Sequence, residues 1–600
     1  MTGGVTRFVP FALVALLIVG CASDEGGVVT AGRPERAEER IRTLIEEESR
    51  PERALTMLPR LQEQGLIEPT RGEELRSAAV RETERLFRAA LEENRVVDAL
   101  VRRQNLELLG RLPEEPSPSR GELMRELADS YLERNNNVGA LAVLLRHPDL
   151  AELSPAELVR YGRVAQESNN RFALRRIMEA LASAGEDPPE EFEAALEKSA
   201  DTSEMINGTV TVWVNRGMRI NQGVGVPDRV IGSGFFIDRR GYLMTNYHVI
   251  ASEVDPEYEG YSRLFVKLPG SSNERTPARV VGYDRVFDLA LLKVEIDPDY
   301  VFAFTNIRKL ESGADIRAIG SPGGLENSIS SGIISAQGRR FLQMGDALQI
   351  DVPVNPGNSG GPLITKEGDL IGVVFAGIEQ FEGVNFAIPS FWIRHFLEKF
   401  YDGGEVKHAW IGVAVREDRE GLEVIYVAPD SPAEEAGLRR GDVITAVNDQ
   451  ELGSIADAND FFLSMYEGNL VKVSYSRPVE EQTEEEQESL VYVDERPFSP
   501  AEEALEAEDV EELFPAVFGM AVREIRSLPW QEEFVVTEVY PGSVADESGL
   551  SVNDPFSLRN WRVNRDARAL LIQIIVKKRK AGFLETGLQL GAYLETDNFI

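Results

Sequence analysis

The spacing of apolar residues changes near residue 208, and this change constrains the fold more than any other feature of the chain. From 34 to 200, leucine and alanine recur every three or four residues among Glu and Arg, which is typical of amphipathic helices. From about 208 to 390 the apolar runs are short, β-branched and aromatic, and punctuated by glycine and proline, which indicates a β-barrel or sandwich. A chain of 600 residues is also too long for one core, so these parts are predicted to be separate domains.

A loose repeat occurs in the helical part. An Ala-Leu pair follows a polar turn four times, which indicates stacked helical hairpins resembling tetratricopeptide-type repeats. The pairs are Ala54-Leu55, Ala99-Leu100, Ala140-Leu141 and Ala173-Leu174. Their spacing is irregular, so a generic helical bundle is an equally good interpretation. Either version favours a surface for partner binding or assembly over a catalytic site, because no cluster of nucleophiles or metal ligands falls in 34–200.

The N-terminus has the form of a secretory signal. Arg7 precedes an apolar run from Phe8 to Val19, which is shorter than the about 20 residues that a membrane span needs. The run leads to Cys21, the only cysteine, in the sequence Ile-Val-Gly-Cys, which resembles a bacterial lipobox. The resemblance implies a lipoprotein signal peptide over 1–21, lipid on the thiol of Cys21 and a tether over 22–33. A plain signal peptide with an incidental cysteine is the alternative.

Charge and composition exclude several classes of function. Acidic residues outnumber basic residues by 101 to 64, giving a net charge of −37, whereas nucleic-acid binding needs a positive surface. One cysteine permits no intrachain disulfide. The sequence has no cluster with metal-ligand spacing and no phosphate-binding loop, so we expect no metal and no cofactor.

The segment from Asp351 to Ile364 places Ser359 among three glycines and before a proline. Glycines allow backbone N–H groups to approach a ligand closely, and a serine hydroxyl becomes a nucleophile when a base and an orienting group accompany it. Of the four histidines, His248 alone follows a strand-like run in this region, and Asp288 opens the next apolar run. The order His, Asp, Ser is that of the chymotrypsin-like double barrel, not of subtilisin or the α/β-hydrolases.

These residues predict a catalytic triad. His248 is expected to act as general base and then acid, Asp288 to fix its tautomer, and Ser359 to attack the substrate carbonyl. The oxyanion hole is predicted at Gly357, Asn358 and Ser359, with the N–H groups of Gly357 and Ser359 as donors. Alone, each motif also fits a strand start, a structural histidine or a turn. The three in this order within an all-β region favour catalysis.

Eight segments of the β region resemble the HtrA (Deg) family of bacterial serine proteases. They are GSGFFID (232–238), TNYHVI (245–250), DLALLKV (288–294), AIGSPGG (318–324), SGIISAQGR (331–339), DVPVNPGNSGGPLI (351–364), GDLIGVV (368–374) and VNFAIPS (384–390). The resemblance implies a chymotrypsin-like double β-barrel over 205–402. It also implies ATP-independent cleavage of unfolded or misfolded proteins in the bacterial cell envelope, facing the periplasm.

The resemblance also implies a substrate cleft along one strand. Its residues would be Val373, Val374, Phe375 and Ala376, where the family usually has a more polar segment. Phe375 would narrow or reshape the pocket for the residue before the cleaved bond, for which small aliphatic residues are the family default.

Two C-terminal units, 409–497 and 513–600, resemble the PDZ domains that this family carries, with an acidic linker over 498–512. In the first PDZ unit the carboxylate-binding loop corresponds to Trp410, Ile411, Gly412 and Val413. Its N–H groups would hold peptide C-termini while the peptide adds a strand to the sheet edge. The second PDZ unit diverges, with Asn-Asp-Pro at 553–555 in place of Gly-Asp, and we expect a helix near 566–580 in it.

The sequence thus predicts a multidomain, lipid-anchored serine endopeptidase of the cell envelope with an N-terminal all-α domain. Its expected partners are unfolded or misfolded proteins, peptide C-termini, the membrane through its lipid and further copies of itself, the trimer being the family habit. The alternative is a chaperone or scaffold that binds clients through its PDZ and helical domains, with latent proteolysis. The complete triad favours the enzyme.

Overall fold

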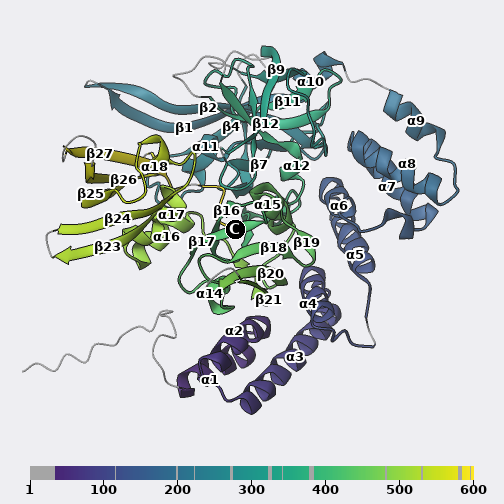
Figure 1. Ribbon diagram of the computed structural model, residues 1–600. Coiled ribbons are helices and arrows are strands. Elements are labelled where there is room, and N and C mark those ends of the chain that lie inside the picture. The colour runs from purple at the N-terminus through teal and green to yellow at the C-terminus, as the bar shows by residue number, and fades with distance from the viewer. Residues whose placement is uncertain are drawn as a thin grey trace, which may run out of the picture.

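The computed structural model describes residues 34–600 except 115–116, 198–200, 222, 271–273, 322–327, 341, 378–383, 480–482, 529–530, 566, 579–583 and 595. The predicted signal peptide, Cys21 and the tether lie outside the described residues. Along the chain follow a helical array, a β-barrel region and two PDZ units, with the end of the chain at the centre of the molecule (Figure 1). None of the described helices is long and apolar enough to cross a membrane.

The helical array is built of consecutive hairpins. Its helices are α1 (Pro34–Glu46), α2 (Pro51–Glu63), α3 (Pro69–Glu92), α4 (Val96–Leu108), α5 (Arg120–Glu133), α6 (Asn137–Leu144), α7 (Pro155–Glu167), α8 (Arg171–Ser183) and α9 (Glu190–Glu197). The turn before each even-numbered helix from α2 to α8 contains one residue in the left-handed conformation, a conformation that asparagine tolerates well. These residues are Ser49, Asn94, Asn135 and Asn169. The alanine of each Ala-Leu pair is fully buried one turn later, so the loose sequence repeat corresponds to a structural repeat.

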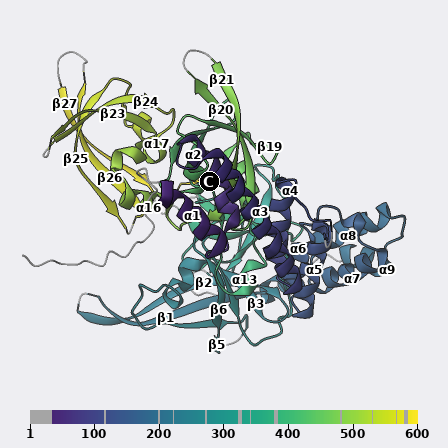
Figure 2. The same cartoon turned by 90° about the horizontal axis from the view of Figure 1, so that it is seen from below.

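The array packs against the rest of the chain instead of standing free. Its first helices lie on the first PDZ unit (Figure 2), and Val138 and Ala142 of α6 pack against the core of the barrel region. Arg53 of α2 forms ion pairs with Glu435 (2.8 Å) and Asp494 (3.0 Å). Arg146, just after α6, donates a hydrogen bond to the carbonyl of His395 at 2.8 Å. The array therefore joins the PDZ unit to the barrel region.

One asparagine makes this docking specific. Asn105 of α4 is fully buried; its amide donates to the carbonyl of Gly468 (2.8 Å) and accepts from the N–H of Leu470 (2.7 Å). The side chain thereby pairs with the backbone as a neighbouring strand would.

We expect Asn105→Ala to loosen this docking by about 3 kcal/mol, because it leaves two buried backbone groups without partners. The N–H of Leu470 should then exchange with solvent on the order of 100-fold faster, measured by hydrogen exchange. Glu107→Ala on the exposed face of the same helix is the matched control and should change the rate little. Equal exchange in both variants would show that Asn105 does not hold the array in place.

The barrel region contains two sheets. The eight-stranded sheet has the order β14-β6-β7-β3-β2-β1-β4-β5, and the other forms a closed barrel, β10-β13-β12-β11-β8-β9. The first sheet comprises β1 (Thr209–Asn221), β2 (Val224–Asp238), β3 (Tyr242–Thr245), β4 (Arg263–Lys267), β5 (Thr276–Pro277), β6 (Arg279–Asp284), β7 (Leu289–Lys293) and β14 (Gly404–Glu405). The barrel comprises β8 (Asp315–Gly320), β9 (Ser328–Arg339), β10 (Ala347–Ile350), β11 (Pro362–Thr365), β12 (Leu370–Gly377) and β13 (Asn385–Pro389). The predicted chymotrypsin-like double-barrel fold is thus confirmed, as one closed barrel and one barrel-like sheet of eight strands.

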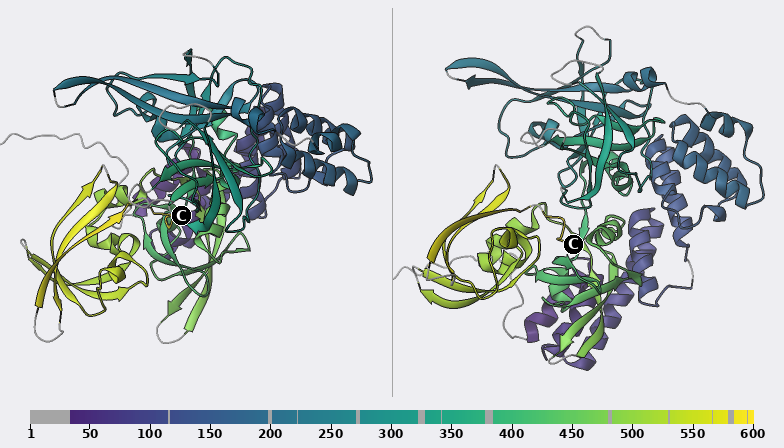
Figure 3. Two further views of the ribbon diagram at one scale, coloured as in Figure 1. Left: turned by 90° about the horizontal axis from the view of Figure 1, so that it is seen from above. Right: turned by 45° about the horizontal axis from the view of Figure 1, so that its top comes forward.

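Each PDZ unit is a sheet with short helices, and the two units lie side by side (Figure 3). The first has the sheet order β16-β17-β18-β20-β21, formed by β16 (Val413–Glu417), β17 (Leu422–Val427), β18 (Val443–Val447), β20 (Leu470–Val479) and β21 (Thr483–Tyr492), with helices α14 (Pro432–Glu435) and α15 (Ile455–Leu463). Short β15 (Ala409–Trp410) and β22 (Asp494–Glu495) pair beside it. The second contains β23 (Met520–Leu528), β24 (Gln531–Val539), β25 (Pro555–Asn564), β26 (Ala569–Lys578) and β27 (Leu584–Tyr593) in order, with α17 (Phe514–Val517) and α18 (Val544–Glu547).

The helix expected near 566–580 is wrong, because β26 occupies most of this segment and pairs with β25 and β27. Alternate residues Leu570, Ile572, Ile574 and Val576 are buried while Gln573 is exposed. Burial of alternate residues is the period of a strand, and pairing on both sides outweighs the helical appearance of the run.

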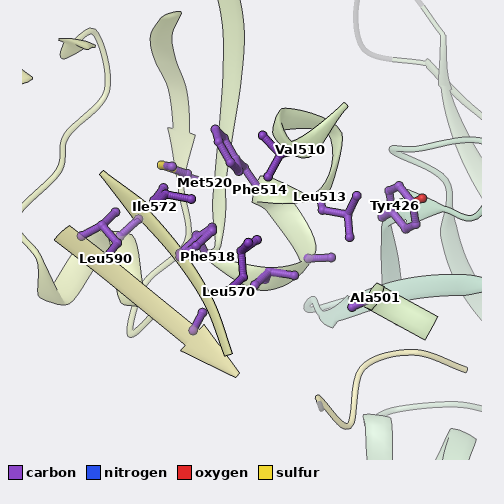
Figure 4. Packing of buried hydrophobic residues seen from close by; sticks show 14 of the residues in the cluster. Tyr426, Ala501, Val510, Leu513, Phe514, Phe518, Met520, Leu570, Ile572 and Leu590 are labelled. Atoms are coloured by element: carbon purple, nitrogen blue, oxygen red, sulfur yellow. The ribbon is translucent and has the colours of Figure 1, made fainter. Parts of the chain in front are cut away.

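The segment predicted as an acidic linker is part of a core. Helix α16 (Pro500–Ala507) buries Ala501 among residues of both PDZ units, including Tyr426 of the first and Phe514 of the second. Figure 4 shows Ala501, Leu513 and Tyr426 at the contact between the two units. The two PDZ units therefore share one continuous apolar cluster.

Candidate active site

The three predicted catalytic residues come from both sheets of the barrel region. His248 lies in the short helix α11 (Tyr247–Ile250) that follows β3, and Asp288 immediately precedes β7. Ser359 lies in the loop before β11 of the closed barrel. Strands β3 and β7 are neighbours in one sheet, which brings His248 and Asp288 together.

Asp288 holds His248 by two hydrogen bonds. Its Oδ2 lies 2.7 Å from Nδ1 of the imidazole, and its Oδ1 accepts the backbone N–H of His248 at 2.8 Å. Asp288 has φ +53°, and its carbonyl accepts from the N–H of Tyr247 (3.1 Å) and the amide of Asn246 (2.8 Å). The carboxylate therefore fixes the ring with Nδ1 protonated, which leaves Nε2 to take a proton.

Ser359 is in a resting orientation. Its Oγ donates to the carbonyl of Phe375 at 3.3 Å, and no hydrogen bond to His248 occurs among the described residues. Catalytic hydrogen bonds are commonly long or absent without substrate and tighten in the complex. For the predicted attack, the hydroxyl would have to turn from Phe375 toward the imidazole.

The loop before Ser359, where the oxyanion hole is predicted, turns at Gly357 and is held by Ser233. Gly357 has φ +109°, a conformation that glycine adopts without strain. The hydroxyl of buried Ser233 donates to the carbonyl of Gly357 (2.6 Å), and the N–H of Ser233 donates to the carbonyl of Ser359 (2.7 Å). In the described part of the chain, the N–H groups of Gly357 and Ser359 donate to no protein group. They are therefore available to a substrate oxygen.

Asn358 has a different role from its neighbours. Its N–H donates to the carbonyl of Asn355 at 2.9 Å, and its buried side chain donates to the carbonyl of Pro353 at 3.2 Å. Asn358 thus holds the loop, while Gly357 and Ser359 supply free donors. Sequence reasoning assigned no role to Ser233, whose one signal was its position in the GSGFFID motif.

The electrostatics of the pair suit a general base near neutral pH. The side chain of His248 is 47% exposed, and the charge of Asp288 and its hydrogen bond outweigh the partial desolvation of the ring, so the pKa of His248 is raised above its ordinary value of 6.5.

We therefore expect kcat/KM to rise with pH through a midpoint above 6.5, because only the neutral imidazole can accept the serine proton. The measurement is the initial rate of cleavage of a short fluorogenic peptide from pH 5 to 9, with circular dichroism at each pH. A rate that stays constant from pH 5 to 8 while the fold persists would contradict this role of His248.

The predicted cleft strand contributes fewer side chains than expected. Val373 and Val374 are fully buried in two core clusters of the barrel, so their side chains cannot contact a substrate. The backbone of Val374 pairs with Gly360 and Gly361 of the nucleophile loop. Phe375 is half-buried, and the side chain of Ala376 lies outside the described part of the structure. Among the described side chains of the predicted cleft, Phe375 is thus the one that is not fully buried.

Two other histidines pair with aspartates that lie far from them in the sequence. His408 Nε2 lies 2.8 Å from Asp284 Oδ2 in full burial, and His395 Nε2 lies 3.0 Å from Asp460 Oδ1. His395 belongs to the barrel region and Asp460 to the first PDZ unit. No cluster of metal ligands occurs among the described residues.

The predicted carboxylate-binding loop lies at the start of β16, beside the end of the chain. Trp410 and Ile411 are buried, Gly412 has φ +93°, and Val413 begins β16. The N–H groups of Gly412 and Val413 donate to the main-chain oxygen of Ile600 at 3.0 and 3.2 Å. The second PDZ unit has a similar loop, with φ +70° at Gly519.

Comparisons with known proteins agree with this arrangement. A trypsin-like peptidase domain matches residues 232–373, a PDZ domain matches 409–491, and a TP0546 family PDZ domain matches 501–594. The last match includes α16, which supports its assignment to the second PDZ unit.

Several curated relatives are named probable periplasmic serine endoprotease DegP-like. The one from Marinomonas sp. (strain MWYL1) is 33% identical over 354 residues, covering 55% of this chain and 71% of the relative. The one from Hahella chejuensis (strain KCTC 2396) is 37% identical over 239 residues, covering 37% of this chain and 49% of the relative. A solved structure, the HtrA-type protease AlgW with decapeptide, is 26% identical with a TM-score of 0.42 and covers 49% of this chain and 98% of that chain.

Proposed function

The chain belongs to the HtrA family of bacterial serine endoproteases, and from this premise we propose that it cleaves unfolded and misfolded envelope proteins with His248, Asp288 and Ser359. The observation that carries the proposal is the pairing of His248 with Asp288 beside two free N–H groups, at Gly357 and Ser359. Base, nucleophile and oxyanion donors are the three parts that acyl transfer needs. No phosphate-binding loop is present in the sequence, which supports cleavage without ATP.

The test compares the rate at which the protease cleaves one small substrate protein in its native form and in its reduced, carboxymethylated form. We expect cleavage of the unfolded form without nucleotide and little cleavage of the native form, because an extended segment must enter the site. Equal cleavage of both forms would contradict selection of unfolded clients.

The orientation of Ser359 favours a second candidate, a chaperone or scaffold with latent proteolysis. Its Oγ is bound to the carbonyl of Phe375 and not to His248. Suppression of aggregation of the unfolded form, without cleavage even after a peptide binds the first PDZ unit, would favour this candidate over the protease.

We further propose a lipid anchor at Cys21 that holds the protein at the envelope with its domains in the periplasm. The support is the lipobox-like sequence and the periplasmic names of the relatives. Cys21→Ser should move the protein from the membrane fraction to the soluble fraction; an unchanged distribution would contradict the anchor.

We also propose a homo-oligomer, with the trimer as the expected state. The long hairpin of β1 and β2 projects from the barrel region (Figure 1) and exposes Met218, Ile220 and Val224. Exposed apolar side chains in a group are typical of contact surfaces. Sedimentation at equilibrium tests the state, and a monomer at micromolar concentration would contradict the proposal.

A further inference from the structure

The end of the chain lies along the open edge of the first PDZ sheet. Val413 and Ile600 exchange two backbone hydrogen bonds, of 3.2 and 2.9 Å, and the N–H of Val415 donates to the carbonyl of Asn598 at 2.9 Å. Ala414 and Phe599 form an antiparallel bridge. Because β16 is the edge strand of this sheet, residues 598–600 add one strand where a peptide ligand would bind.

The side chains of this strand are anchored on both faces. Ile600 is 1% exposed and belongs to the core cluster of the first PDZ unit, together with Ile411 and Phe462. Phe599 is fully buried on the other face, where its ring meets Tyr426 at 6.1 Å between centroids. Alternate side chains therefore fill alternate pockets, as in peptide recognition by strand addition.

Asp597 connects the strand to the remaining parts of the site. Its carbonyl accepts from the amide of Asn459 on α15, the helix beside the groove, at 3.3 Å. Its carboxylate pairs with Arg340 of the barrel region at 3.4 Å, and Arg340 also pairs with Glu417 at the end of β16. The segment 597–600 is thus in contact with both PDZ units and with the barrel region.

We propose that segment 597–600 is an intramolecular ligand of the first PDZ unit, which closes its groove to client peptides until it is displaced. The proposal rests on the proposed function in treating this unit as a peptide-binding module. A tethered ligand competes at an effective concentration near millimolar, so for an intrinsic Kd of about 10 μM a client peptide of similar sequence binds about 100-fold more weakly than to an empty groove. A successful competitor must offer a comparable apolar residue for the pocket of Ile600.

The test is the binding of a fluorescein-labelled peptide with the sequence 591–600, measured by fluorescence anisotropy. The full chain carries Ser359→Ala so that the probe is not cut. We expect Ile600→Asp to strengthen probe binding about 100-fold, because a carboxylate in the apolar pocket expels the segment. Ile600→Val is the matched control and should bind the probe as weakly as the unchanged tail. Equal affinity in all three proteins, or binding to none, would overturn the proposal.

A disulfide provides a second test that does not depend on emptying the groove. Ala414 and Phe599 are a non-hydrogen-bonded antiparallel pair, whose Cα atoms lie close enough for a disulfide. With Cys21→Ser, the double variant Ala414→Cys, Phe599→Cys should form an intramolecular disulfide, detected by mass spectrometry, and exclude the probe until a reductant is added. Absence of the disulfide would also overturn the proposal. Casein cleavage by the chain with Ser359 intact is measured separately, so a failure of the protease proposal can be distinguished from a failure of the intramolecular-ligand proposal.

Discussion

Replacing Ser359 by alanine is expected to lower kcat for casein cleavage about 10⁶-fold, which is the scale of losing the nucleophile in a triad. The remaining rate comes from binding and from the oxyanion donors, which the substitution leaves in place. The hydroxyl makes one long hydrogen bond, to the carbonyl of Phe375 at 3.3 Å, so its removal should change the free energy of unfolding by no more than about 1 kcal/mol.

The control for this prediction is Ser331→Ala, which removes an exposed hydroxyl from β9 of the same barrel and should leave cleavage unchanged. Thermal unfolding of both variants should match that of the unchanged protein. Cleavage that survives Ser359→Ala would mean a contaminant or a different nucleophile, and loss in both variants would mean damage to the barrel.

The residues of the candidate triad and the Ala-Leu pairs of the helical array could be singled out from the sequence because their signals are local. Ser359 and its glycines occupy one loop, and His248 and Asp288 each adjoin a recognisable strand. The asparagines before α4, α6 and α8 adopt the left-handed conformation that their residue type favours. In each case a few adjacent residues determine the local geometry, so the sequence alone indicates that geometry.

The features that escaped prediction depend on contacts between distant segments. Ser233 holds the carbonyls of Gly357 and Ser359 across more than 100 residues, and Asn105 pairs with Gly468 from another domain. Strand β26 was expected to be a helix because pairing with β25 and β27 is not visible in its own sequence. The placement of Ile600 beside Val413 likewise follows from how the two PDZ units pack.

Asp288→Asn is expected to lower kcat about 10⁴-fold with little change in the fold. Asparagine tolerates the left-handed backbone at this position, where φ is +53°, better than alanine would, so the substitution isolates the carboxylate. Its amide would face Nδ1 of His248 and favour the tautomer with the proton on Nε2. That tautomer cannot accept the proton of Ser359.

The pH dependence separates this role from a purely structural one. The charge of Asp288 and its hydrogen bond raise the pKa of His248, and Asp288→Asn removes that charge, so the pKa of His248 should fall. The midpoint of kcat/KM should therefore move to lower pH while the plateau falls, as measured with the fluorogenic peptide. A variant that merely loosens the site would lower the plateau and leave the midpoint near its original pH. Activity within tenfold of the unchanged enzyme would mean that Asp288 does not orient His248 for catalysis. The two hydrogen bonds between Asp288 and His248, at 2.7 and 2.8 Å, would then stabilise the fold only.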